Sequence, residues 1–310
     1  MPDFDFCGSS DVRRVFPITA GHKAAEHMRG GYPGMNQFLT PAQVTQFTSD
    51  AGVQKAKSSI GKLLVLGFLA GAFIALGFLV DLRITAGLPK AWGTLKLFLG
   101  AAVFPVGLMF VVIAGGELLT GNMMSLPLAW HQRRIRFGGI LYNWFWVLIG
   151  NLIGSLFVAY VFGIGAHLLT EAPWSTATIA LATDKVTLPF GATILSGIGC
   201  NWLVCLAVWM AYAAKDIIGK IFAIWFPIMT FVAIGFQHVV ANMFIIPAAI
   251  FLGAPISWGQ AIVEWIGAFI GNAIGGWLFV ATAYWYAYHK EAKQSESGIS
   301  TPSETANARL

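Results

Sequence analysis

A histidine with amide neighbours lies in the middle of a long apolar stretch of this 310-residue chain. The segment Gly235–Asn242 reads GFQHVVAN, which places Gln237 directly before His238 and Asn242 four residues after it. A polar side chain is costly to bury at bilayer depth, so it normally faces a cavity there. Because imidazole exchanges a proton near neutral pH, this segment predicts a site that handles a small ion or a proton.

A second polar interruption resembles the first in its position within an apolar stretch. The segment Gly115–Asn122 reads GGELLTGN, with Glu117 and Thr120 among the glycines. A close helix crossing through small residues would explain the glycines, but not the two polar side chains. Non-helical backbone at membrane depth is tolerated where it lines a cavity or is buried in protein. We therefore expect this segment to lie beside a pore.

The two segments belong to a duplicated unit of about 120 residues. The phrase [GA]-N-M-x-x-x-P occurs at 121–127 and 241–247, and I-G-N-x-I-G occurs at 149–154 and 270–275. An interrupted helix in each of two repeats is typical of transporters whose site lies between the repeats. Asn122 and Asn242 would then face each other across one cavity near the membrane midplane. Asn151 and Asn272 are interpreted as packing residues with an interhelical amide hydrogen bond.

Composition places the chain in a membrane. It is 57% hydrophobic and 11% charged, with a mean hydropathy of +0.70, and a crossing helix needs about 20 apolar residues. Six apolar runs meet this requirement, near 60–80, 97–116, 139–163, 188–213, 219–236 and 262–288. Shorter apolar pieces at 122–130 and 242–252 would complete the second and fifth crossings. The prediction is an all-α polytopic protein with a transport domain at 59–290, its repeat halves at about 59–165 and 185–290.

Lysine and arginine residues near the span ends predict the orientation. Ten lie on the side of both termini and the His131–Arg136 loop, whereas four lie on the other side: Arg83, Lys90, Lys96 and Lys185. The positive-inside rule then places both termini in the cytoplasm, and we expect the cell membrane. Because each repeat has three crossings, the second enters from the opposite face and the duplication is inverted. The net charge of +5 requires no nucleic-acid partner.

The two ends differ in composition from the spans. Residues 1–39 mix glycine, proline, histidine and charges, and predict a cytoplasmic segment with partial order. The capping sequence Thr40-Pro41-Ala42-Gln43 opens a short amphipathic helix within 40–58. Residues 291–310 are rich in Ser, Thr, Glu and Asn, and predict a disordered cytoplasmic tail.

Other functional classes have weaker support. The sequence has no phosphate-binding loop, dinucleotide fingerprint, nucleophile elbow, C-x-x-C pair or histidine spacing for a metal, so we expect neither cofactor nor enzyme activity. A membrane enzyme would need paired acids, and Glu117 and Glu264 belong to different repeats. An aquaporin-type pore for neutral solutes would carry two Asn-Pro-Ala boxes, but here each proline follows its asparagine five positions later.

Four motifs resemble the formate/nitrite transporter family, and the resemblance covers roughly residues 40–290. They are Gly235–Phe244 (GFQHVVANMF), Asn201–Trp209 (NWLVCLAVW), Glu117–Asn122 (ELLTGN) and Ile270–Tyr284 (IGNAIGGWLFVATAY). The resemblance implies an aquaporin-like protomer of six helices, with the second and fifth interrupted, assembled as a homopentamer. It also implies one pore per protomer for small weak-acid anions: formate, nitrite, and in some members lactate or hydrosulfide.

The resemblance assigns roles to individual residues. The central pore residues of the family correspond to His238, Thr120 and Asn201. One apolar constriction corresponds to Leu108, Leu118 and Leu119, and the opposite one to Val204 and Phe231. The vestibule lysine corresponds to Lys185. Many members carry glutamate directly before the histidine, whereas this chain has Gln237.

These assignments suggest a proton-linked mechanism. An ion in an apolar constriction loses its hydration at large cost, and a proton on a weak-acid anion removes most of that cost. Burial disfavours the charged form of His238, whereas an arriving anion favours it, so the pair can share a proton. We expect His238, Thr120 and Asn201 to form a relay, although anion channelling without a proton remains open. The long N-terminal segment and the Ser/Thr-rich tail are typical of eukaryotic proteins. Partly for this reason, nitrite is favoured over formate as the substrate.

Overall fold

The computed structural model describes residues 38–297, and their regular structure is helical apart from one isolated bridge between Phe38 and Ala214. Within this range, six helical stretches are long and apolar enough to cross a membrane. They are Ile60–Thr85, Thr94–Gly115, Phe137–Gly165, Phe190–Ala213, Ile217–Ile234 and Trp258–Glu291. The predicted six-helix membrane fold is therefore confirmed. Most of the expected N-terminal segment and tail, at 1–39 and 291–310, lies outside the described residues.

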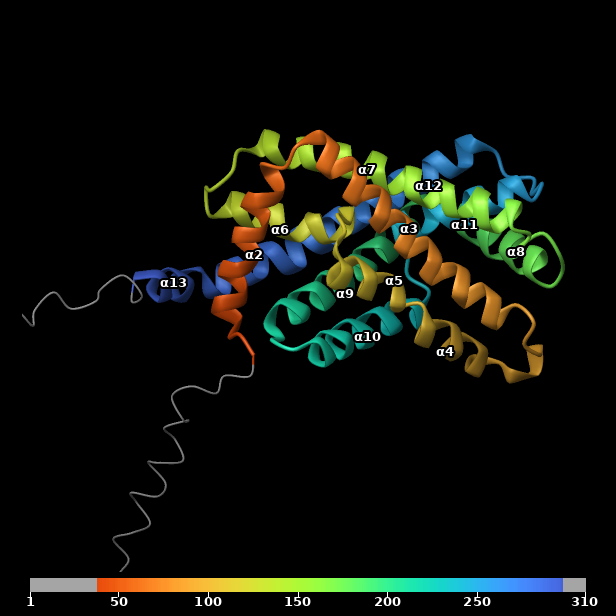
Figure 1. The fold of residues 1–310 in the computed structure, drawn as a ribbon, viewed down its shortest axis with the longest axis horizontal. Coiled ribbons are helices and arrows are strands. Elements are labelled where there is room, and N and C mark those ends of the chain that lie inside the picture. Colours follow the sequence, from red (N-terminus) through yellow and green to blue (C-terminus); the bar gives the residue numbers. More distant parts are fainter. Residues whose placement is uncertain (1–37, 298–310) are drawn as a thin grey trace, which may run out of the picture. The chain divides into compact units, whose positions relative to one another are not determined.

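Some of these stretches are a single helix, and others consist of two or three consecutive helices. Figure 1 shows the arrangement of the helices. The first repeat contains α3 (Ile60–Thr85), α4 (Thr94–Val103), α5 (Val106–Met109), α6 (Leu119–His131) and α7 (Phe137–Phe157). The second contains α9 (Phe190–Ala213), α10 (Ile217–Ile234), α11 (Val239–Phe251), α12 (Trp258–Gly276) and α13 (Ala283–Ser297). The π-helical turns η2 (Phe110–Gly115), η3 (Val158–Gly165) and η4 (Trp277–Thr282) continue α5, α7 and α12.

The second and fifth crossings are interrupted, as predicted. The second crossing stops at Gly115 (φ 100°), and the fifth stops at Gly235 (φ 86°), two left-handed conformations that glycine adopts without strain. The chain then runs extended before α6 and α11 begin. Each half-helix starts three residues earlier than its apolar run suggested, because Thr120, Asn122 and Asn242 are polar but helical.

Glycines bring the long helices of each repeat into close contact. A Cβ atom on Gly71 of α3 would lie 2.1 Å from the carbonyl oxygen of Asn151 on α7. A Cβ atom on Gly271 of α12 would lie 2.2 Å from the carbonyl oxygen of Ile194 on α9. Only glycine permits these two crossings, which is the way that small residues pack helices in membranes. The two pairs form equivalent walls around the interrupted helices.

Besides the half-helices α6 and α11, two further α-helices of the described residues, α2 (Pro41–Ala56) and α8 (Trp174–Thr187), lie outside the spanning stretches. The first, α2, has the predicted capping box between Thr40 and Gln43, and it packs on α6 and α13. The second, α8, packs on α11 and was missed by the sequence analysis. It occupies in the second repeat the place that α2 occupies in the first. Each short helix ends beside one interrupted helix and supplies a lysine to it, Lys55 from α2 and Lys185 from α8.

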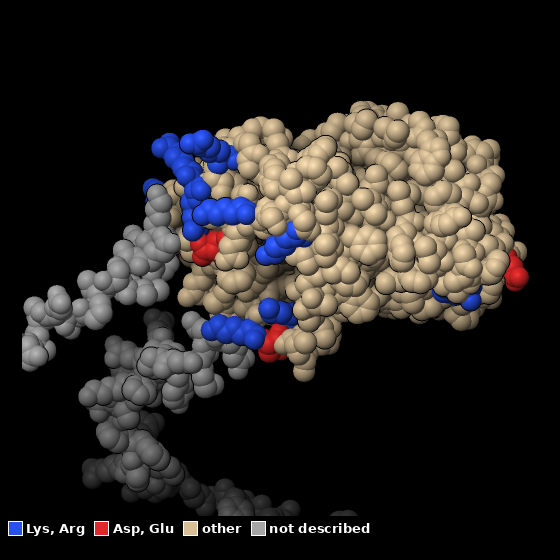
Figure 2. All heavy atoms as spheres, turned by 45° about the horizontal axis from the view of Figure 1, so that its top comes forward, with Lys and Arg blue, Asp and Glu red and all other residues tan. Residues whose placement is uncertain are grey.

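The charged side chains are separated by an uncharged band. Figure 2 shows lysines and arginines gathered at one end of the molecule, with few charges on the middle of the visible face. The loop after α6 contributes Arg133, Arg134 and Arg136 to the basic side, and Arg134 is paired with Asp50 of α2 at 2.6 Å. This distribution is typical of a protein that crosses a bilayer.

Candidate transport pore

Three cavities follow one another between the two repeats. The largest, about 740 Å³, contains Lys185 and is named the Lys185 vestibule. The smallest, about 10 Å³, is named the central chamber and has room for about one water molecule. The third, about 150 Å³, contains Lys55 and is named the Lys55 vestibule. Neighbouring cavities share lining residues, so the three lie along one path.

His238 stands where the Lys185 vestibule meets the central chamber. Its Nε2 atom lies 3.0 Å from Oγ1 of Thr120, and its Nδ1 atom accepts the backbone N–H of Ala241 at 3.1 Å. The second bond makes the histidine side chain the N-cap of α11. Because Nδ1 is an acceptor, the proton of the neutral ring lies on Nε2, which donates to Thr120. The hydroxyl proton of Thr120 is then directed to a different acceptor.

Apolar side chains surround the remainder of the central chamber. Phe104 and Phe231 separate it from the Lys185 vestibule, and the Phe231 ring stacks on His238 at 5.9 Å between centroids. Leu108 and Leu118 separate it from the Lys55 vestibule. The chamber is completed by Ile74, Val204 and Ile228. His238 is the one polar residue among those that line the chamber, and Thr120 lies behind it, fully buried and bonded to its ring.

Four of the five predicted constriction residues line the central chamber. Leu108, Leu118, Val204 and Phe231 line the chamber, whereas Leu119 is fully buried and lines none of the three cavities. Phe104, Ile74 and Ile228 also line the chamber and were not predicted from the sequence. The repeat could have indicated Ile228, because it follows Leu108 by 120 residues.

Asn201 serves the backbone of the site. Its Nδ2 atom donates to the carbonyl oxygens of Thr120 at 3.1 Å and Asn272 at 2.7 Å. Its side chain lines none of the three cavities, and its Oδ1 atom has no hydrogen-bond partner among the described residues. Of the three residues expected in a relay, the structure brings two side chains together, those of Thr120 and His238.

Asn151 and Asn272 hold the two helix interruptions. Each makes three hydrogen bonds of 2.8–3.0 Å, one to a carbonyl of a neighbouring long helix and two to backbone groups where the extended segment meets the half-helix. The partners of Asn151 are the carbonyls of Gly67 and Glu117 and the N–H of Leu119. The partners of Asn272 are the carbonyls of Gly197 and Gln237 and the N–H of Val239. These bonds satisfy backbone groups that the interruptions leave unpaired, a role beyond the predicted helix packing.

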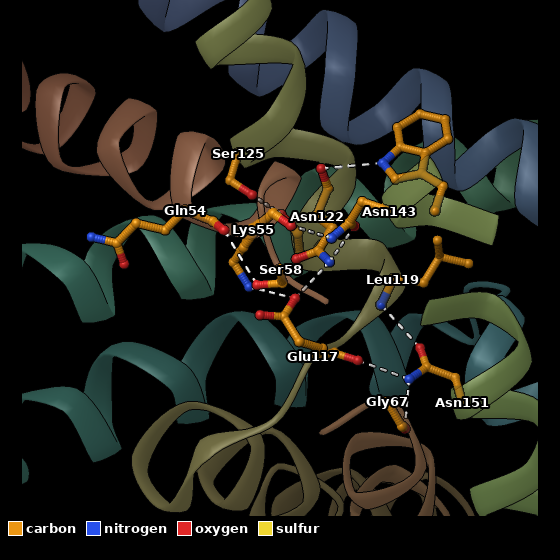
Figure 3. A network of polar contacts seen from close by, with 12 residues as sticks. Gln54, Lys55, Ser58, Gly67, Glu117, Leu119, Asn122, Ser125, Asn143 and Asn151 are labelled. Atoms are coloured by element: carbon orange, nitrogen blue, oxygen red, sulfur yellow. Dashed lines mark hydrogen bonds and ion pairs between the residues drawn. The ribbon is translucent and has the colours of Figure 1, made fainter. Parts of the chain in front are cut away.

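A network of polar side chains lies at the Lys55 vestibule (Figure 3). Lys55 Nζ forms an ion pair with Glu117 Oε2 at 2.8 Å, and the same oxygen accepts Asn122 Nδ2 at 2.8 Å. Asn122 also donates to Oδ1 of Asn143 at 2.8 Å. Burial acts to lower the pKa of Lys55, but Glu117 and Tyr212 together outweigh burial, and the pKa lies above its usual value.

A related network lies at the Lys185 vestibule. Lys185 Nζ donates to Gln237 Oε1 at 2.8 Å, and Asn242 Nδ2 donates to the same oxygen at 2.9 Å. Asn242 also donates to Oε1 of Glu264 at 2.6 Å. Burial lowers the pKa of Lys185, and the negative charge of Glu264 offsets only part of this effect. This vestibule also contains Asp81, which the sequence analysis did not consider although it follows the first apolar run.

One expectation about the half-helix asparagines is wrong. Asn122 and Asn242 do not face each other across one cavity, because Asn122 lines the Lys55 vestibule and Asn242 lines the Lys185 vestibule. The chamber is lined instead by Leu118 and His238, which are the N-cap residues of the two half-helices α6 and α11. Each asparagine lies about one turn further along its own half-helix, and the inverted repeats carry the two in opposite directions.

Comparisons with known proteins identify the family of this chain. The family model described as "Formate/nitrite transporter" matches residues 42–286. An uncharacterized transporter of Bacillus subtilis, YrhG, is 56% identical over 82% of this chain and 95% of its own length. The formate channel BtFdhC of Bacillus thuringiensis is 51% identical over 82% of this chain and 97% of its own length.

Solved structures give the same result. An "FNT family ion channel" has a TM-score of 0.74 at 28% identity, covering 79% of this chain and 98% of its own. A "Pentameric formate channel with formate bound" has a TM-score of 0.61 at 27% identity, covering 74% and 98%. The chain therefore belongs to the formate/nitrite transporter family and is a multi-pass membrane transport protein, not an enzyme.

Proposed function

We propose that this protein conducts formate across the cell membrane as a homopentamer, with one pore in each protomer and both termini in the cytoplasm. The observation that carries the proposal is the Thr120–His238 pair at the edge of an apolar chamber of about 10 Å³. A relative named as a formate channel is 51% identical, and a similar solved structure is named as a pentameric formate channel. The basic side that includes Arg133–Arg136 supports the orientation.

The pore selects by charge and by size in this proposal. Lys185 attracts an anion into its vestibule, since a positive group at a cavity mouth raises the local concentration of negative solutes. The apolar chamber then rejects ions whose charge it cannot compensate. A monovalent anion of a weak acid passes, because a single proton makes it neutral. Val204, Phe231, Leu108 and Leu118 form the apolar constrictions, and Leu119 and Asn201 hold the backbone in place.

The proton link is proposed to run through the substrate. Protonation of His238 at Nδ1 would place a donor against the N–H of Ala241, which already occupies that atom. The cap of α11 therefore favours the neutral ring. Adding a proton to the anion in a vestibule costs less free energy than adding it to the His238 ring. The His238 ring orients Thr120, whose hydroxyl proton then donates to the substrate oxygen in the chamber. Asn201 supports this pair through the Thr120 carbonyl.

The named relatives favour formate over nitrite as the first substrate to test. Nitrite was the expectation from the sequence, and it shares with formate a bent shape of three heavy atoms and a single charge. The residues of the chamber offer no contact that distinguishes the two anions. Nitrite therefore enters the experiment as a competitor.

Purified protein in liposomes tests the proposal. We expect saturable uptake of labelled formate, inhibition by nitrite, no glycerol permeation, and one proton moved with each anion as reported by an internal pH dye. Protein-free liposomes correct for diffusion of formic acid through lipid. Formate uptake no faster than in those liposomes would refute the transport proposal, and uptake without proton movement would refute the proton link alone.

A further inference from the structure

The two lysine networks exchange a carboxylate and an amide between equivalent positions. Glu117 in the first repeat corresponds to Gln237, which follows it by 120 residues. Asn143 in the first repeat corresponds to Glu264, which follows it by 121 residues. In both networks an asparagine of the half-helix bridges the pair, with bonds of 2.8 and 2.8 Å in the first repeat and 2.9 and 2.6 Å in the second. Each network therefore has one acid, but on opposite sides of its asparagine.

This exchange changes what each lysine touches. Lys55 contacts a carboxylate directly at 2.8 Å, so its charge is compensated at contact distance. Lys185 contacts an amide oxygen at the same distance, so the group that holds it is neutral. The remaining polar atom of Gln237 is Nε2, a hydrogen-bond donor, whereas the remaining atom of Glu117 is an acceptor. Lys185 and Gln237 line their vestibule, so both can donate to an anion there, although Asp81 and Asp184 lie in the same wall. At the Lys55 vestibule the lysine is instead held by a carboxylate.

Glu264 belongs to the second network but does not contact Lys185. Its side chain is 4% exposed and reaches Lys185 only through Asn242 and Gln237, by bonds of 2.6, 2.9 and 2.8 Å. Its negative charge still stabilises the ammonium group of Lys185, as described above. The ammonium group lines the cavity of about 740 Å³ together with Gln237 and His238.

We propose that the exchanged carboxylate and amide make the two faces of the pore chemically unequal, so that the Lys185 vestibule holds the anion more tightly than the Lys55 vestibule does. Gln237 and Glu264 determine this difference: Gln237 leaves Lys185 open to the anion, and Glu264 favours the charged lysine without contacting it. The inference rests on the proposed anion transport, but it concerns the difference between the two faces of the pore. The established family membership does not require such a difference.

The inference is tested by measuring, separately from each face, the formate concentration that gives half-maximal uptake of labelled formate (KM). Intact cells expose one face and inside-out vesicles expose the other, and thiol labelling of Lys90→Cys identifies the face of Lys185. We expect the lower KM at that face. Because a passive pore must have the same ratio of Vmax to KM in both directions, we also expect the lower Vmax from that face.

Two matched variants change the charge of one network each: Gln237→Glu adds a carboxylate beside Lys185, and Glu117→Gln removes the carboxylate beside Lys55. Gln237→Glu should raise KM at the Lys185 face by about three- to hundredfold, the range for one charge ~6 Å from the anion between bulk-water and near-surface dielectric constants. Glu117→Gln should lower KM at the Lys55 face and leave the Lys185 face unchanged. Lys90→Gln, which removes an exposed charge outside both networks, controls for general surface potential and should change neither value.

The double variant Gln237→Glu/Glu264→Asn gives the second network the same residues as the first, with one acid and one amide. It can replace Gln237→Glu in the experiment if that single variant folds poorly. It should give similar KM values on the two faces. Equal KM values in the unmodified protein, or an unchanged Lys185 face in both variants, would overturn the inference. Absence of formate flux in the unmodified protein would instead refute the proposed substrate, and nitrite flux from the two faces would then decide the inference.

Discussion

Thr120 Oγ1 and His238 Nε2 lie 3.0 Å apart, although 118 residues separate them in the chain. They are not symmetry partners: the repeat pairs Leu118 with His238 and Thr120 with Val240. Each break therefore contributes one polar residue and one apolar residue, and the polar ones meet across the repeat axis. A symmetric scaffold thus holds an asymmetric pair, in which His238 lines the single central chamber and Thr120 is bonded to the His238 ring.

Removal of the Thr120 hydroxyl should slow transport. Thr120→Val leaves the Nε2–H of His238 without an acceptor and the substrate without a donor, at a cost of about 1–3 kcal/mol. We expect formate uptake to fall by about 5- to 150-fold in liposomes, because 1.4 kcal/mol corresponds to about tenfold. Thr120→Ser keeps the hydroxyl and should retain most of the flux. Equal rates for the Val and Ser variants would argue against this role.

The cap formed by His238 makes a separate prediction about stability. His238→Phe removes the acceptor for the N–H of Ala241 and should cost about 0.5–2 kcal/mol. Asn is among the best capping residues, so His238→Asn should unfold near the temperature of the unmodified protein. Thermal unfolding in detergent measures both. If the Phe variant were as stable as the Asn variant, the Nδ1 bond would contribute nothing to the fold.

Neighbouring leucines should have different roles. Leu118 lines the chamber, so Leu118→Ala should widen the constriction, raise formate flux, and admit lactate more readily. Leu119 is fully buried outside the three cavities, so Leu119→Ala should lower the free energy of unfolding by about 2–5 kcal/mol. The comparison uses lactate-to-formate flux ratios together with thermal unfolding. A change of selectivity in Leu119→Ala without one in Leu118→Ala would reverse these assignments.

Thiol labelling should reveal the orientation. Lys90 and Arg136 are exposed at opposite ends of the spanning helices, and the described cysteines, Cys200 and Cys205, are buried. In a Cys7→Ser background, a membrane-impermeant maleimide should label Lys90→Cys in intact cells and Arg136→Cys only after lysis. The opposite pattern would place the termini outside.

Much of this protein could be predicted from its sequence, because the relevant signals are local. The length of each apolar run determines a crossing, and Gly115 and Gly235 interrupt two of them. The position of His238 within an apolar stretch marked the pore, since burial of a polar group at that depth needs a cavity. The repeated phrases related the two halves. These conclusions need no knowledge of which side chains meet.

Side-chain partners depended on the tertiary structure. In the sequence, Lys55 is simply one of the ten basic residues on the side of the termini, but in the structure it pairs with Glu117, which is 62 residues away. Asn201 was expected in the relay, yet it binds backbone carbonyls. The exchange of acid and amide between Glu117 and Gln237 has meaning only once α2, α8 and the half-helices are placed. A hydrogen bond requires approach within about 3 Å in a fixed direction, and only the packing of distant helices determines which side chains reach that distance.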